Sequence, residues 1–402
     1  MNKEQDILLR LIANELFNKN YIIPKLTNAE WQTIIIESKE QAVLRIAYSS
    51  ADKAGVPKII SDLWYQESLH YLENNLTIYH NHLLLNDWLT QADISYVILK
   101  GCSSAYYYPN QSDRIMGDVD FLIKKTDMER VDNVLKKHGL QPWDLDHICH
   151  IVYRSKRKHY EMHFDIPGVP NGEVGDLIHK YIDDIFASSF TYSTANGSIQ
   201  LPSKFHHGLI IILHTSHHLT SEGIGLRHLC DWAVFLNSCS NEEFKDLFEE
   251  KFKSIGMWKF ACVLSKICID YLGCSPKSCI DDIEVKLIKD LIDDIFQGGN
   301  FGFKDHNRVF EGKLISDKGK GTFNSQSMIG NYVKSINAGV HAKWSFSKKC
   351  PIILPFGWFF FGTKRLFKIV FGKVKKPKIV KSIKVAKKRQ DLYIRLGIFE
   401  IL

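Results

Sequence analysis

Apolar residues recur three and four positions apart over most of the first ninety residues, which is the period of a helix with one buried face. The pattern is clear in Leu8, Leu11 and Ile12 and returns between residues 63 and 83. Residue types that carry catalysis do not gather in this part of the chain. We therefore expect residues 1–92 to form a helical N-terminal cap.

The pattern changes to that of strands after residue 93. Residues 96–99 form a short apolar run that ends at Lys100 and Gly101, as expected for a buried strand that enters a turn. A second strand is predicted from Asp118 to Ile123, and a helix is predicted from about Asp127 to His138.

Two further strands are predicted as a hairpin. They run from His147 to Tyr153 and from His159 to Ile166, and a basic turn at residues 154–158 joins them. Strands and helices together predict an α/β (α+β) core with a small mixed sheet over residues 93–200.

Helical periodicity returns from Pro202 to about Ile295, with a break at residues 223–225. We expect a helical C-terminal domain over residues 201–340. Within it, residues 296–330 contain several glycines and are predicted to be loops.

The last segment, residues 341–402, is a basic aromatic tail. Fifteen Lys or Arg and no Asp or Glu lie between His341 and Gln390, so the +7 charge of the whole chain less this +15 leaves −8 for the other residues. Aromatic residues gather between Pro351 and Phe361, ahead of most of the lysines. This pattern fits a packed terminus, peripheral contact with an anionic membrane surface, or contact with nucleic acid.

Composition indicates a globular protein: the chain has 402 residues, of which 45% are hydrophobic and 24% charged. It has no run of about 18 uncharged apolar residues and opens with charges, so neither a transmembrane segment nor a signal peptide is expected. The nine cysteines form no CxxC pair. This argues against a disulfide framework and favours a reducing cytoplasm.

Asp118 and Asp120 carry the clearest chemical signal. Side chains alternate along a strand, so two residues separated by one lie on the same face, roughly 7 Å apart. Two such carboxylates can share a hard cation such as Mg²⁺ or Mn²⁺, together with phosphate oxygens of a substrate.

The turn before this strand predicts a phosphate site. Gly101 allows close approach of the backbone, and a helix that opens at Ser103 and Ser104 offers free N–H groups to an anion. Basic side chains that could offset phosphate charge are those of Lys100, Arg114 and Lys124.

A third carboxylate is expected from the second strand of the hairpin. Glu161 and Asp165 share its polar face with His159 and His163. Such a carboxylate could complete the coordination of a metal ion and orient or deprotonate an attacking hydroxyl. Glu161 is the first choice and Asp165 the second.

These residues resemble the uncharacterised nucleotidyltransferase family within the polymerase-β-like superfamily, over about residues 30–370. The resemblance implies a nucleotidyltransferase fold. It also implies a glycine-serine turn at Gly101 and Ser103, a metal pair at Asp118 and Asp120, and a third acid at Glu161. Cys102 departs from the pattern, because the wider superfamily usually has Gly or Ser there.

Histidines offer weaker signals. His207, His214 and His218 lie on one face of a predicted helix, together with His217 nearby, and a zinc site there is conceivable. His147, Cys149 and His150 could bind zinc with His163, but strand alternation would place His150 opposite His147. Arg227 and Asp231, four apart, suggest an ion pair on a helix surface. His214, His217 or Arg227 could also contact a nucleotide or acceptor.

The sequence thus predicts a Mg²⁺-dependent nucleotidyltransferase that binds a nucleoside triphosphate such as ATP. It would transfer the nucleoside monophosphate to an acceptor and release pyrophosphate. The acceptor could be a small molecule, a peptide, a protein or an RNA end. The alternative is a nucleotide-binding or RNA-binding regulatory module on the same fold, which would not need Glu161 beside the metal pair.

Overall fold

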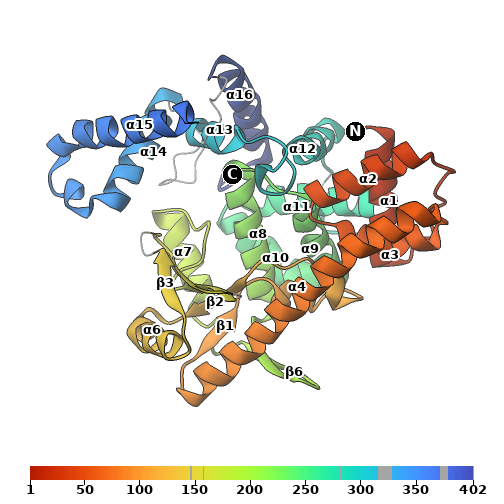
Figure 1. Cartoon of the computed structure of the whole chain (residues 1–402), viewed down its shortest axis with the longest axis horizontal. Coiled ribbons are helices and arrows are strands. Elements are labelled where there is room, and N and C mark those ends of the chain that lie inside the picture. Colours follow the sequence, from red (N-terminus) through yellow and green to blue (C-terminus); the bar gives the residue numbers. More distant parts are fainter. Residues whose placement is uncertain (145–146, 157, 281, 316–327, 372–378, 402) are drawn as a thin grey trace.

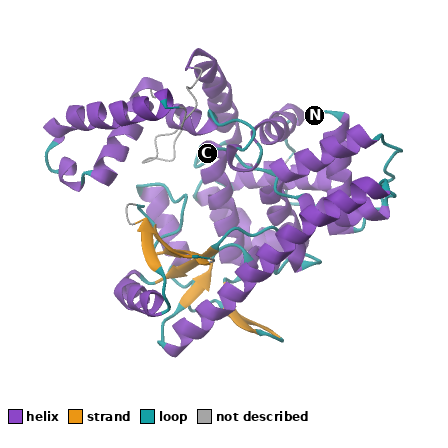
Figure 2. Cartoon of the chain, viewed as in Figure 1, coloured by secondary structure: helices purple, strands orange, loops and turns teal. Residues whose placement is uncertain are grey.

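The computed structural model describes residues 1–144, 147–156, 158–280, 282–315, 328–371 and 379–401. Helices make up most of this part of the chain, and the strands gather in one region (Figure 1, Figure 2).

A five-stranded mixed sheet occupies the middle of the chain, in the order β1-β2-β5-β4-β3. β2 and β5 run parallel, whereas the other neighbouring strands are antiparallel. The mixed sheet predicted from the sequence is therefore confirmed. Its strands are β1 (Tyr96–Ile98), β2 (Val119–Ile123), β3 (Gln141–Asp144), β4 (His150–Ser155) and β5 (Lys158–His163).

The strands differ from the prediction mainly at their ends. β2 begins one residue after Asp118, and β4 begins at His150, three residues later than predicted. β3 was not predicted, and it pairs with β4 through an irregular register that involves Pro142. Residues 147–149 therefore lie in a bend before β4, so strand alternation does not apply to them.

Two helices cover one face of the sheet. Helix α4 (Lys58–Gln91) contributes Trp88 and Leu89, and helix α6 (Met128–Lys137) contributes Val131 and Leu135. These side chains share a buried apolar core with residues on one face of β2 and β5, including Phe121, Tyr160 and Met162. A small hairpin of β6 (Phe190–Thr194) and β7 (Gly197–Leu201) packs against α4 and β1.

The first three helices are α1 (Lys3–Phe17), α2 (Asn28–Glu40) and α3 (Leu44–Lys53). Capping boxes begin α1 at Asn2 and α2 at Thr27. In each, the side chain of the cap residue accepts from the backbone N–H three residues later, and the side chain of that later residue accepts from the backbone N–H of the cap residue. Residues from these helices share one large core with helices after residue 201, as Leu8, Trp31 and Trp232 show. The boundaries at residues 92 and 200 stay a prediction.

Helices fill the C-terminal half as well. In chain order they are α8 (Lys204–Thr220), α9 (Leu226–Asn237), α10 (Asn241–Ser254), α11 (Trp258–Ile267), α12 (Val285–Gly298), α13 (Arg308–Ile315), α14 (Met328–Lys343), α15 (Leu354–Val370) and α16 (Ile379–Leu396), and two short helices, α5 (Cys102–Ala105) and α7 (Glu173–Ile182), precede them.

Helix α13 corrects the prediction that residues 296–330 are loops. Its first residue, Arg308, is buried and donates to both carboxylate oxygens of Asp294 on α12. Glu311, also in α13, pairs with Arg389 at 3.2 Å. These partners are distant in sequence, so local periodicity could not reveal them. Residues 316–327 of the predicted loop lie outside the described residues.

The tail divides into two parts. Helix α16 packs against α12 and α13, and its buried Arg389 and Tyr393 both donate to the carbonyl of Leu219 at the end of α8. Helices α14 and α15 instead form a hairpin that projects from the rest of the molecule (Figure 1). Among the described residues, none of the helices combines the length and apolar character needed to cross a bilayer.

Candidate active site

A cleft of about 470 Å³ lies between one face of the sheet and helices α8 and α9. Both walls are polar. The sheet side contributes Lys100, Gly101, Asp118, Asp120, Glu161 and His163, and the helical side contributes His214, His217, His218, Arg227, His228 and Asp231.

Three carboxylates converge on this cleft. Asp120 in β2 stands directly opposite Glu161 in β5, because the two parallel strands pair in that register. Asp118 precedes β2 and also faces the cleft. Oxygens of Asp118 and Glu161 and a ring nitrogen of His159 all lie within 4.8 Å of one another. The structure thus brings together the three acids selected from the sequence.

Lys100 and His163 hold Asp120. The Lys100 Nζ lies 2.8 Å from Asp120 Oδ1, and His163 Nε2 lies 3.0 Å from the same oxygen. Burial alone would raise the pKa of Asp120, but Lys100 and His163 keep that pKa well below its usual value. Asp120 is therefore ionised across the physiological range.

Asp118 has the opposite shift. Burial, followed by the charge of Asp120, raises the pKa of Asp118 to about 7, although Lys100 opposes this rise. Burial is the largest influence on Glu161 and acts against its charged form, but His163, Lys100 and His150 together lower its pKa. The cleft thus holds more carboxylate charge than its own cations offset.

Comparison with known families bears on this arrangement. The chain matches the family described as "Uncharacterised nucleotidyltransferase" over residues 27–273, which is more than half of its length. The chain belongs to this nucleotidyltransferase family. The match includes the sheet, the three carboxylates and helices α8 to α11, and it ends well before residue 370, where the resemblance was expected to end. No curated protein and no solved structure matches the chain.

Gly101, in the turn before α5, has a backbone conformation that suits glycine and strains other residues. Its φ of 64° and ψ of −109° lie in a region that L-residues avoid, and an added Cβ would lie 3.2 Å from His82 Nε2. Ser104 lines the cleft, whereas the hydroxyl of Ser103 is buried away from solvent. Cys102 is buried beside Met116, so its side chain packs in the core.

The predicted phosphate cations have protein partners in this structure. Lys100 pairs with Asp120 and lies 3.2 Å from His214 Nε2. Lys124 is exposed near the ring of Phe186 and does not line the cleft. Whether Lys100 or Arg114 contacts phosphate stays a prediction.

Arg114 and Asp231 form a buried bidentate ion pair. Arg114 Nε and Nη2 donate to the two oxygens of Asp231 at 2.8 and 2.7 Å, and the Tyr108 hydroxyl donates to the same carboxylate. The predicted surface pair of Arg227 with Asp231 is therefore wrong. Arg227 instead donates to the carbonyl of Ile115 and lies over the ring of Phe301.

The helical wall presents histidines that favour the neutral form. His214 Nε2 lies 2.8 Å from His218 Nε2, and His218 Nδ1 lies 2.8 Å from Glu222. Burial lowers the pKa of both histidines. His217 and His228 line the same wall.

His207 does not join this wall. It is buried and stacks on Tyr107 at 4.9 Å, and burial lowers its pKa to about 3. Seven residues of helix separate it from His214 by roughly 10 Å. The zinc site suggested for His207, His214 and His218 is therefore not assembled.

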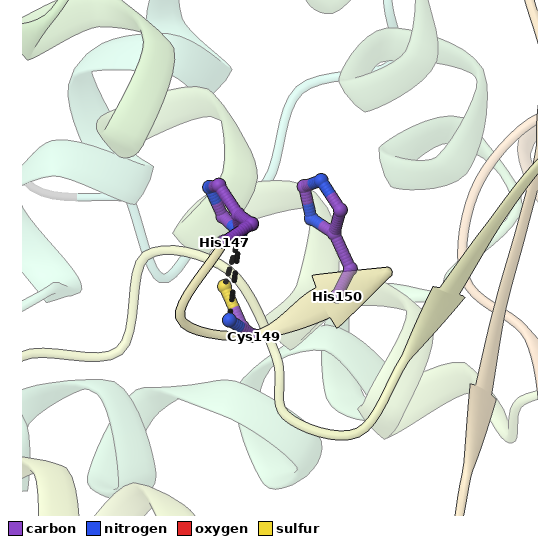
Figure 3. A group of neighbouring side chains, drawn as sticks. All are labelled: His147, Cys149 and His150. Carbon is purple, nitrogen blue, oxygen red and sulfur yellow. Dashed lines mark hydrogen bonds between the residues drawn. The ribbon is translucent and has the colours of Figure 1, made fainter. Parts of the chain in front are cut away.

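A second group of histidines corrects the argument from strand alternation. His147, Cys149 and His150 lie in the bend that enters β4, and their ligand atoms all lie within 4.8 Å of one another (Figure 3). His150 also groups with Glu161 and His163 in the same way. Asp165, the second choice for the third carboxylate, lines a neighbouring cavity and contacts His179 at 3.0 Å.

Replacement of Gly101 by alanine should cost about 1–3 kcal/mol of folding stability, because the new side chain would force a strained backbone and crowd His82. The free energy of unfolding from denaturant titration measures this loss. Gly117→Ala is the matched control, since Gly117 also lines the cleft but an added Cβ meets no atom within 4 Å. Equal stability of the two variants would contradict the strain at Gly101.

Asp231→Asn should destabilise the protein by about 3–5 kcal/mol, because it leaves the buried Arg114 without a counter-charge. The double variant Arg114→Met, Asp231→Leu should recover much of this loss, since it removes both charges. Asp246→Asn, on the exposed face of α10, is the control. Denaturant unfolding compares all three, and an unperturbed Asp231→Asn variant would show that the pair does not hold the fold.

Proposed function

We propose that this protein is a divalent-metal-dependent nucleotidyltransferase that moves a nucleoside monophosphate from a nucleoside triphosphate to an acceptor. The observation that carries this proposal is the convergence of Asp118, Asp120 and Glu161 in one cleft of a chain that belongs to a nucleotidyltransferase family. Such a cluster provides hard oxygen ligands of the kind that Mg²⁺ and Mn²⁺ prefer.

The electrostatics of the cleft fit a cation of this kind. Asp118 is partly buried next to the ionised Asp120, and burial and then the charge of Asp120 raise its pKa. Asp118 and Asp120 would hold the ion and Glu161 would complete its ligand set. The bound ion would stabilise charge on the phosphate oxygens during transfer.

The reaction is an in-line displacement at the α-phosphorus. A bond forms between an acceptor oxygen and the α-phosphorus, while the bond from that phosphorus to the bridging oxygen breaks and pyrophosphate leaves. Glu161 is ionised, so its carboxylate can accept the hydrogen bond of an attacking hydroxyl and then its proton. Throughout this step, the ion pair with Lys100 keeps Asp120 ionised.

The remaining cleft offers contacts to the triphosphate. Gly101 and Ser104 form the wall next to Asp118, and Arg227 brings a positive charge from α9 on the other side. We assign Arg227 to the phosphates because Arg114 is committed to Asp231 through both of its hydrogen bonds.

A non-catalytic nucleotide-binding or RNA-binding module is the alternative function. Binding alone would require phosphate contacts and at most a metal pair. The in-register position of Glu161 opposite Asp120 favours catalysis, because a third, partly buried carboxylate adds electrostatic cost that binding does not require.

The projecting hairpin supports peripheral contact of this enzyme with an anionic membrane surface. Phe356, Phe359 and Phe367 on α15 are 69%, 76% and 63% exposed, which is unusual for aromatic side chains of one helix. Lys349 and Lys364 are exposed near them. Aromatic insertion beside basic charge is the arrangement that interfacial helices use, whereas contact with RNA would interleave aromatic and basic residues. Phe356 and Phe359 precede the basic residues of α15, and only Phe367 stands among them.

Asp118→Asn and Asp120→Asn should each reduce nucleotidyl transfer by on the order of a hundredfold or more, because each removes a charged metal ligand. Transfer is measured as label from radioactive triphosphates that becomes attached to molecules of a cell extract, with pyrophosphate release in parallel. Asp62→Asn on the exposed surface of α4 is the control.

The stability of the two variants should differ. Asp118→Asn should unfold no earlier than the wild type, because burial and Asp120 already disfavour its charge, whereas Asp120→Asn loses the ion pair with Lys100. Full transfer by a folded Asp118→Asn variant would refute the proposed role of the carboxylates.

The triple variant Phe356→Ser, Phe359→Ser, Phe367→Ser should lose sedimentation with anionic liposomes at low and at high salt, because salt does not screen the burial of aromatic surface. A variant with Trp143→Ser and Phe303→Ser, which changes exposed aromatic residues of the body, should sediment like the wild type. Membrane contact would be excluded if the wild-type protein did not sediment with the liposomes, or if it bound RNA and not liposomes.

A further inference from the structure

The bend that enters β4 brings a sulfur ligand and two imidazoles together. Cys149 Sγ lies 3.5 Å from His147 Nδ1, and the rings of His147 and His150 have centroids 3.8 Å apart (Figure 3). The three ligand atoms lie within 4.8 Å of one another. We propose that His147, Cys149 and His150 bind a transition-metal ion of the Zn²⁺ class at the edge of the cleft.

The donor set decides the class of metal. A thiolate and two imidazoles are soft and borderline ligands, which suit Zn²⁺ and Co²⁺, whereas Mg²⁺ requires oxygen ligands. This site is therefore chemically distinct from the carboxylates Asp118 and Asp120, and its assignment does not depend on nucleotidyl transfer. Binding forms a metal–sulfur bond and releases the thiol proton of Cys149 to solvent.

The backbone holds two of the three ligands in place. The N–H of Phe164 donates to the carbonyl of Cys149 at 3.0 Å, and His150 pairs with His163 across β4 and β5. His147 is exposed, so its ring can turn toward an ion without disturbing the core. A rigid pair and one adjustable ligand allow the tetrahedral geometry that Zn²⁺ prefers.

His150 has an unsatisfied nitrogen. Its buried Nδ1 finds no hydrogen-bond partner among the residues that the structure describes, and its Nε2 lies 4.0 Å from Glu161 Oε2. A carboxylate beside the second nitrogen of a metal-binding histidine orients the ring and strengthens it as a ligand. Glu161 would take this part for His150 after a movement of about 1 Å that brings its carboxylate within hydrogen-bond distance.

The site adjoins two cavities. His147 and His150 line the cleft of the carboxylates, while His147 and Cys149 also line a neighbouring cavity of about 490 Å³. Three protein ligands leave one tetrahedral position for water or a substrate group. The ion would therefore lie in the wall that these two cavities share.

Titration of the full-length protein with Co²⁺ tests this site, after treatment with a chelator and in a reductant that does not bind metal. We expect the thiolate-to-cobalt charge-transfer absorption and the visible bands of tetrahedral Co²⁺ to saturate at one ion per chain, since an ion at the carboxylates has no thiolate ligand. Zn²⁺ should displace it and Mg²⁺ should not. Cys149→Ser should abolish the charge-transfer band and weaken binding about tenfold or more, and His147→Ala should weaken binding similarly.

Two variants serve as controls. Cys350→Ser removes an exposed cysteine far along the chain and should leave the spectrum unchanged. Asp118→Asn should also keep the charge-transfer band, because it alters the oxygen site alone. Circular dichroism confirms that each variant is folded. Absence of the band in the wild type, or its persistence in Cys149→Ser, would overturn the assignment.

Discussion

The ion pair between Lys100 and Asp120 sets the electrostatics of the cleft. One ammonium offsets one carboxylate, and the parallel pairing of β2 with β5 fixes Glu161 opposite Asp120, so further negative charge remains in a buried place. Burial and this negative charge together raise the pKa of Asp118, which reduces its charge near neutral pH. A divalent cation removes the same surplus without protonation. The fold thus leaves negative charge in the cleft that the proposed divalent cation would neutralise.

The wall formed by α8 and α9 faces the carboxylates without adding unpaired negative charge. Burial keeps His214 and His218 neutral, so α8 presents hydrogen-bonding groups that do not compete with Lys100 for Asp120. The buried pair of Arg114 with Asp231 ties the segment before β2 to helix α9. Because a desolvated bidentate pair tolerates little displacement, it fixes the width of the cleft between the two walls.

The sequence was sufficient where the signal is local. Asp118 and Asp120 are separated by one residue, and the apolar run around them predicts a strand, so their common direction follows from the geometry of a strand. The pair of Arg114 with Asp231 spans more than a hundred residues, and no periodicity reports such a contact. Alternation was also applied to residues 147–149, although β4 begins only at His150, and this small error in a boundary separated three side chains that the bend brings together.

The contacts of α16 have a consequence for how much of the chain is needed to fold. The family match ends at residue 273, yet Arg389 and Tyr393 satisfy the last turn of α8, whose histidines form a wall of the cleft. A fragment cut at the family boundary would expose the apolar core that α12 and α16 cover, and would leave the carbonyl of Leu219 to solvent. The helices beyond residue 273 therefore support a wall of the cleft that α16 itself does not line.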